Sequence, residues 1–124
     1  MEKQKILIAD DSEMNRALLV DILEDQYDIV EADNGAAAID LLTQCGGNFS
    51  LLLLDIMMPE MDGFEVLAYI NRYHLNDTLA VIMISADDSP ANIKRAYDLG
   101  AFDYISRPFD AAIVRRRISN TMLL

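Results

Sequence analysis

The segment FSLLLLD, Phe49 to Asp55, contains four consecutive leucines and ends in an aspartate. Such a short, unbroken apolar run is typical of a strand that is buried on both faces. Strands of this kind occur mainly in parallel sheets, because the connecting helices cover both sides of the sheet. The segment therefore favours an α/β fold with a parallel sheet.

The rest of the chain alternates strand patterns with helical patterns. In the helical segment after the first strand, Met14, Leu18 and Ile22 recur every four residues. Asp11 or Ser12 is expected to cap that helix. The other predicted strands are short apolar runs at residues 5–10, 27–32, 79–85 and 103–106. Five strand–helix units with right-handed crossovers predict one domain, residues 1–124, with a doubly wound five-stranded parallel sheet and helices on both faces.

Composition narrows the classes of protein to which the chain can belong. With 10 Lys and Arg against 21 Asp and Glu, the formal net charge is -11, which argues against direct nucleic-acid binding. No apolar run is long enough to span a membrane. The single cysteine excludes an internal disulfide framework, and it fits a reducing, cytoplasmic location.

Polar residues follow the predicted strands where a parallel sheet binds its ligands, outside the carboxyl ends. Asp10 and Asp11 follow the first strand, and Asp55 ends the third, which we expect to be its neighbour. Carboxylates held close together repel one another or recruit a cation, and oxygen ligands favour Mg²⁺. Ser85 and Arg107 end the fourth and fifth strands. Together these groups predict a cradle for a tetrahedral oxyanion, with a carboxylate as nucleophile.

These motifs resemble those of the receiver domains of two-component response regulators. The resemblance covers the whole chain and lies in ADD at residues 9–11, LLLLDIMMPEMDG at 51–63, MISA at 83–86 and GAFDYISRPF at 100–109. The separations are 44 positions from Asp11 to Asp55, 30 from Asp55 to Ser85 and 22 from Ser85 to Arg107. The resemblance implies a flavodoxin-like sheet with strand order 2-1-3-4-5.

The resemblance also implies a role for each site residue. Asp55 would accept a phosphoryl group from the phosphohistidine of a histidine kinase or phosphotransfer protein. Asp11, Asp55 and the Met57 carbonyl would bind Mg²⁺ directly, and Asp10 would bind it through a water. The domain would be a phosphoacceptor rather than a separate enzyme, promoting its own phosphorylation and slow self-dephosphorylation.

A second group of residues would change state after phosphorylation. Ser85 would hydrogen-bond the phosphoryl group and move toward it, and Tyr104 would then swing inward. The family uses its fourth helix, fifth strand and fifth helix for dimerisation. The resemblance further implies that residues 1–124 are the N-terminal receiver of a longer regulator, with an output domain in the same full-length chain.

The sequence departs from the family at Arg107, where lysine is usual. Arginine is a planar fork that can bind two oxygens, whereas lysine is a point charge, so the strength or lifetime of the signal is expected to differ. The bond before Pro108 is expected to be cis, as in the family. Met57 and Asp87 occupy the positions that tune self-hydrolysis.

Three alternative functions share single features with this sequence. A flavin-binding electron carrier needs a phosphate loop after the first strand, where this chain has the acidic, glycine-free DDSEMN. A phosphatase of the haloacid dehalogenase type needs a second aspartate two residues after the nucleophile, where Met57 stands. A phosphorylation-poor pseudo-receiver that only docks partners stays open because of Arg107.

Overall fold

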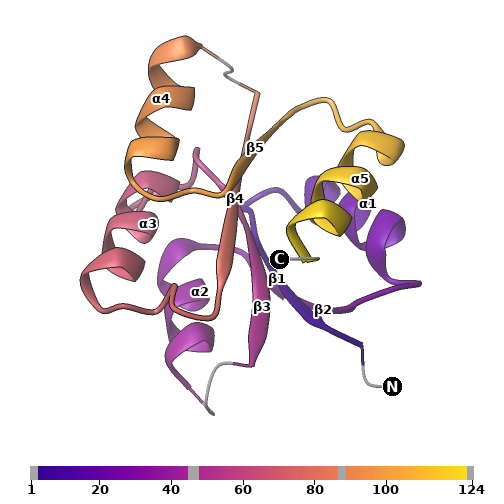
Figure 1. Ribbon diagram of the computed structural model, residues 1–124, viewed down its shortest axis with the longest axis horizontal. Coiled ribbons are helices and arrows are strands. Elements are labelled where there is room, and N and C mark those ends of the chain that lie inside the picture. Colours follow the sequence, from indigo (N-terminus) through magenta and orange to yellow (C-terminus); the bar gives the residue numbers. More distant parts are fainter. Residues whose placement is uncertain (1–2, 45–47, 87–88, 123–124) are drawn as a thin grey trace.

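The computed structural model describes residues 3–44, 48–86 and 89–122, within which five strands and five helices alternate (Figure 1). Cys45 and Asp87 lie outside the described residues. The strands are β1 (Lys5–Ala9), β2 (Asp28–Ala32), β3 (Phe49–Asp55), β4 (Ala80–Ser85) and β5 (Asp103–Ser106). The helices are α1 (Glu13–Leu23), α2 (Gly35–Thr43), α3 (Gly63–Arg72), α4 (Pro90–Asp98) and α5 (Ala111–Met122).

The strands form one parallel sheet in the order β2-β1-β3-β4-β5. The predicted fold class and strand order are therefore confirmed. Because all five strands are parallel, their carboxyl ends lie along one edge of the sheet. The loops that leave this edge contain Asp10, Asp11 and Arg107.

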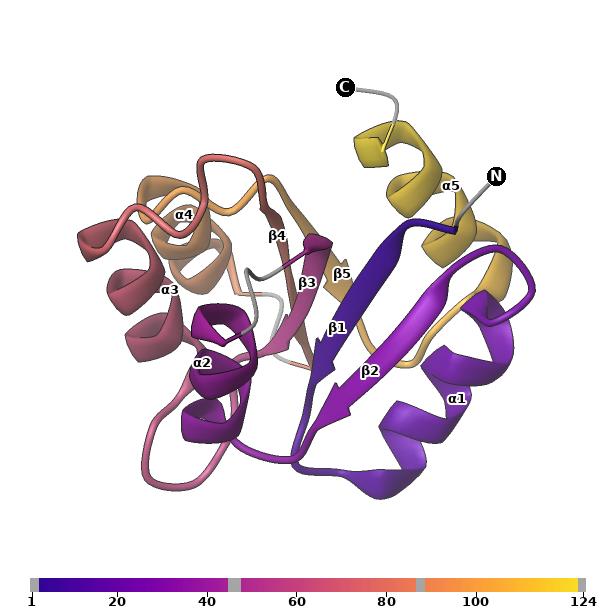
Figure 2. The same ribbon diagram turned by 90° about the horizontal axis from the view of Figure 1, so that it is seen from below.

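The four leucines of β3 pack alternately on the two faces of the sheet. Leu52 and Leu54 lie in a core cluster with residues of α2, α3 and α4. Leu51 and Leu53 lie in a second cluster with residues of α1 and α5. Figure 2 shows these two layers of helices on opposite sides of the sheet. Since each buried leucine contributes about 2 kcal/mol, both apolar faces of β3 hold this strand in the centre of the fold.

Helices that start close to the carboxyl edge have polar side chains as N-caps. Ser12 rather than Asp11 caps α1, because its Oγ accepts a hydrogen bond from the Asn15 amide at 3.2 Å. Ser89 caps α4 and Pro90 occupies its first turn. Among the helices of the described segments, none has both the length and the apolar character needed to cross a membrane.

Gly63 brings the start of α3 into contact with the end of β3. Its amide donates to the Ile56 carbonyl at 2.8 Å. A Cβ at this position would lie 2.4 Å from the Asp55 carbonyl oxygen and 2.7 Å from the Ile56 Cα. Because both obstacles are backbone atoms, they cannot rotate away, and only glycine allows this approach.

We expect Gly63→Ala to destabilise the domain by about 2 kcal/mol, because the new methyl group overpacks a rigid site. Urea unfolding followed by circular dichroism measures this change. Helix propensity alone would favour alanine, so the control is Ala36→Gly at an exposed position of α2, which should cost about 1 kcal/mol. Equal or greater stability of Gly63→Ala would contradict the close approach.

Candidate functional site

Two buried carboxylates lie side by side at the carboxyl edge. Asp10 directly follows β1 and Asp55 is the last residue of β3, and the pairing of Ala9 with Leu54 places these strand ends together. Asp10 is 0% exposed and Asp55 is 1% exposed. The exposed Asp11 completes the group, since ligand oxygens of the three carboxylates lie within 4.8 Å of one another. The predicted convergence of these three aspartates is therefore present in the fold.

Arg107 reaches this pair from the end of β5, the edge strand that lies two strands away from β3. Its Nη2 donates to Asp55 Oδ1 at 3.0 Å, and its Nη1 lies 3.8 Å from Asp10 Oδ2. Because β4 lies between β3 and β5, the side chains of Arg107 and Asp55 together bridge strands that lie about 10 Å apart. The Arg107 amide donates to the Ser85 carbonyl at 2.9 Å, and the peptide bond to Pro108 is cis.

One oxygen of each buried carboxylate is anchored by the backbone. Asp10 Oδ1 accepts from the Ser12 amide at 2.8 Å, and Asp55 Oδ1 accepts from the Met57 amide at 3.3 Å. Within the described part of the chain, the buried Oδ2 atoms of both aspartates and Nε of Arg107 have no hydrogen-bond partner. Buried polar atoms are normally paired, so these atoms mark a place where a further group binds.

The pKa of Asp55 is raised to about 7. Burial is the largest cause, and the neighbouring Asp10 charge adds to it; Arg107 and the Met57 amide act in the opposite direction. One guanidinium therefore does not fully compensate the two buried carboxylates. An additional cation at this edge would favour the ionised form of Asp55.

A divalent cation fits these residues. Three carboxylates offer closely spaced oxygens, and the Oδ2 atoms of Asp10 and Asp55 have no hydrogen-bond partner among the described residues. Hard oxygen donors are the ligands that Mg²⁺ prefers. Asp10, Asp11 and Asp55, with the Met57 backbone carbonyl two residues further on, are the groups that would hold the ion.

The predicted switch residues lie next to this site. Ser85 is fully buried at the end of β4, opposite Ser106 of β5. Tyr104 is buried in the cluster that also contains Ala96 of α4. The Tyr104 carbonyl accepts a hydrogen bond from Arg117 of α5 at 3.0 Å. Tyr104 is therefore buried in the core on the α4 side of the sheet and is linked through its carbonyl to α5.

Arg16 is a site residue that sequence reasoning missed. Its Nη1 donates to the backbone carbonyl of Asp10 at 2.7 Å, and its Nε pairs with Glu31 at 3.1 Å. It thereby fixes the loop that carries Asp10 and Asp11. The signal was present, because Arg16 is the only basic residue between Lys5 and Arg72.

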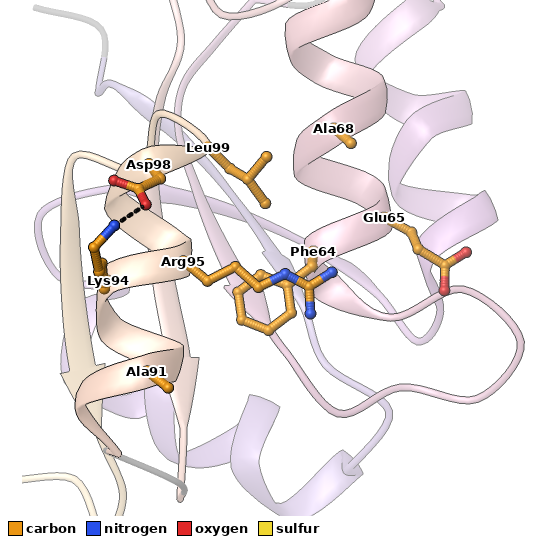
Figure 3. A pocket seen from close by; sticks show the side chains of 8 residues that line it. All are labelled: Phe64, Glu65, Ala68, Ala91, Lys94, Arg95, Asp98 and Leu99. Atoms are coloured by element: carbon orange, nitrogen blue, oxygen red, sulfur yellow. Dashed lines mark hydrogen bonds and ion pairs between the residues drawn. The ribbon is translucent and has the colours of Figure 1, made fainter.

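A groove between α3 and α4 lies outside this acidic site (Figure 3). The Arg95 guanidinium stacks over the Phe64 ring, 4.1 Å from its centroid, and Lys94 pairs with Asp98 along α4. Phe64 directly follows Gly63, so one wall of the groove begins where α3 touches β3. None of the acidic or basic residues of the site lines the groove.

Comparisons with known proteins agree with this geometry. A family model described as the response regulator receiver domain matches residues 6–119. A probable cyclic di-GMP phosphodiesterase of Vibrio cholerae is 34% identical over 113 residues, covering 91% of this chain and 25% of that protein. The transcriptional regulatory protein SrrA of Staphylococcus aureus is 35% identical over 127 residues, covering 95% of this chain and 51% of that protein. The chain thus spans between a quarter and about half of these relatives.

Solved structures show the same likeness. A chain of the CheX–CheY–BeF3–Mg complex from Borrelia burgdorferi has a TM-score of 0.90 and 30% identity, with 98% of this chain and 90% of that chain covered. A probable two-component system response regulator/GGDEF domain protein has a TM-score of 0.88 and 28% identity, covering 96% and 49%.

Without metal, we expect Asp55→Asn to stabilise the domain at high pH. The folded state holds the Asp55 proton up to about pH 7, whereas the unfolded chain releases it near the ordinary value of 3.8. The contribution of Asp55 to stability is therefore largest below about pH 4 and is lost as pH rises toward about 7. Because one pKa unit corresponds to about 1.4 kcal/mol, the gain at about pH 8 should be a few kcal/mol.

Urea unfolding in a chelator at about pH 5 and about pH 8 measures this difference. Asp40→Asn, an exposed position on α2, controls for the loss of one negative charge from an acidic protein. A stability difference between parent and Asp55→Asn that stays constant over this pH range would contradict the shifted pKa.

Proposed function

Because this chain belongs to the family of response regulator receiver domains, we propose that Asp55 accepts a phosphoryl group from the phosphohistidine of a histidine kinase or a phosphotransfer protein. The observation that carries this proposal is the state of the Asp55 carboxylate. Arg107 and the Met57 amide hold Oδ1, and Oδ2 is unpaired among the described residues. A nucleophile that is oriented through one oxygen and has no hydrogen-bond partner on the other suits an in-line displacement.

The transfer exchanges one bond to phosphorus for another. The nitrogen–phosphorus bond of the donor breaks as an oxygen–phosphorus bond to Asp55 forms, and the imidazole leaves with its electron pair. Charge on the phosphoryl oxygens has to be offset next to Asp10 and Asp11. Arg107 supplies hydrogen bonds toward these oxygens, and its unpaired Nε is a further donor. Mg²⁺, when bound, neutralises the carboxylates and the phosphoryl oxygens.

The readout of phosphorylation passes through Ser85 and Tyr104 to the surface formed by α4, β5 and α5. Tyr104 contacts Arg117 of α5 through its carbonyl, and Arg117 also pairs with Asp103 at 2.9 Å. On the same surface, Tyr97, Phe102 and Ile113 are large exposed apolar residues. An apolar surface next to the switch residues supports contact with a second copy or with an output domain.

The domain acts, in this proposal, as a regulatory part of a longer cytoplasmic protein. Its relatives include proteins named as a phosphodiesterase and as a transcriptional regulator, and the chain spans at most about half of each. The receiver would promote its own phosphorylation and slow self-dephosphorylation, and the output domain would perform the regulated activity.

Phosphorylation is tested directly by intact mass. We expect the purified domain, incubated with acetyl phosphate and Mg²⁺, to gain one phosphoryl group because Asp55 is an oriented nucleophile. Asp55→Asn should gain none, and omission of Mg²⁺ should reduce the gain strongly. If the parent domain gains no phosphoryl group, the phosphoacceptor proposal fails and a role limited to partner docking takes its place.

Self-association is tested on the same phosphorylated sample. If the α4–β5–α5 surface pairs two copies, Ile113→Asp should weaken the dimer by roughly tenfold or more, because a buried contact is replaced by a charge. Light scattering coupled to size exclusion measures the dimer fraction. Leu18→Asp on α1 is a matched control, since Leu18 is 48% exposed and Ile113 is 50% exposed. Equal effects of the two variants would place the interface elsewhere.

A further inference from the structure

We propose that Arg107 is a built-in counter-cation that bridges Asp10 and Asp55 and competes with the divalent ion for these carboxylates. This inference rests on the magnesium site of the proposed function. It concerns the metal-free and metal-bound forms of the domain, before any phosphoryl transfer. Arg107 would then set how tightly the site binds its metal.

The guanidinium contacts two of the three carboxylates that form the candidate metal site. It makes a hydrogen bond of 3.0 Å to Asp55 and an ion pair of 3.8 Å with Asp10. The Asp10 oxygen of this ion pair, Oδ2, is also an oxygen without a hydrogen-bond donor among the described residues, and hence a candidate metal ligand. A metal ion and the guanidinium therefore require the same oxygen.

The backbone of Arg107 is held in place, whereas its guanidinium can turn away from Asp10. Its backbone is held by the hydrogen bond to Ser85, and its side chain is only 18% exposed. Its buried Nε has no partner within the described residues, so the fork is not fixed by a third contact. Metal binding must therefore separate the guanidinium from Asp10, and the lost attraction lowers the affinity for the metal.

The planar fork, and not the positive charge alone, makes this bridge. An arginine presents several N–H groups in a fixed plane, so two of its nitrogens can face two carboxylates at once. A lysine at position 107 carries the same charge on a single nitrogen. Arg107→Lys therefore keeps the charge near the site but removes the second nitrogen that contacts a carboxylate.

Arg95 provides a matched reference. It lies in α4, where its guanidinium stacks over the Phe64 ring and lines the groove outside the acidic site. Arg95→Lys makes the same chemical change away from the clustered carboxylates. It therefore leaves metal affinity close to that of the parent.

Titration with Mn²⁺, followed through the electron paramagnetic resonance of the free ion, tests the proposal without phosphorylation. We expect Arg107→Lys to bind Mn²⁺ roughly tenfold more tightly than the parent, as one charged contact no longer competes. Arg107→Met, which also removes the charge, should bind at least as tightly as Arg107→Lys. Arg95→Lys should bind like the parent.

Two results would overturn the proposal. If only Arg107→Met binds more tightly, the positive charge alone lowers the affinity for the metal, and the contact of two guanidinium nitrogens with two carboxylates has no effect. If none of the proteins binds Mn²⁺, the carboxylates are not a metal site. The mass experiment reads phosphoryl uptake separately, so a domain that binds Mn²⁺ as expected but gains no phosphoryl group refutes the phosphoacceptor function and leaves the bridge intact.

Thermal unfolding supplies a second readout. In a chelator, Arg107→Lys should melt several degrees below the parent, because Asp10 loses its charged neighbour. With saturating Mn²⁺ the difference should shrink or reverse, since tighter metal binding stabilises the variant. A difference that is the same with and without Mn²⁺ would mean that Arg107 is only structural, and the proposal would be wrong.

Discussion

The two buried carboxylates of Asp10 and Asp55, held side by side at the ends of adjacent parallel strands, are the constraint on which the rest of the site depends. Each loses its hydration, and each repels the other, so the pKa of Asp55 rises to about 7. The fold offsets part of this cost with backbone amides and with Arg107, and the clustered carboxylates offer oxygens to a further cation. In the proposed function, Asp55 exchanges these neighbours for a metal ion and a phosphoryl group.

The same edge connects the site to three separate parts of the fold. Gly63 joins α3 to the backbone of Asp55, the Ser85 carbonyl accepts from the Arg107 amide, and Tyr104 precedes Arg107 by three residues in β5. A change of charge at Asp55 therefore acts directly on the residues that begin α3 and end β4 and β5. Such a local electrostatic event can shift the balance between two arrangements of a distant surface.

Much of this arrangement was predictable from the chain. The apolar runs of the strands predict a parallel sheet. In such a sheet, the aspartates at the ends of the first and third strands are expected to lie at one edge. The contact of Arg107 with Asp10 was not predictable, because it depends on a side chain that crosses β4. Arg16 was missed because its contact with the site is to a backbone carbonyl, and its only trace in the sequence is that Arg16 is the one basic residue between Lys5 and Arg72. Ser12 and Asp11 were equal candidates for the cap, and only the geometry of the turn separates them.

The most direct test of the central claim is a crystal structure of the domain grown with Mg²⁺ and beryllofluoride, a stable mimic of a phosphoryl group. The account predicts that the mimic is attached to Asp55, that Mg²⁺ is held by Asp10, Asp11 and Asp55, and that Arg107 has left Asp10 to donate to the mimic. A structure with an unmodified Asp55 and with Arg107 still between Asp10 and Asp55 would contradict it.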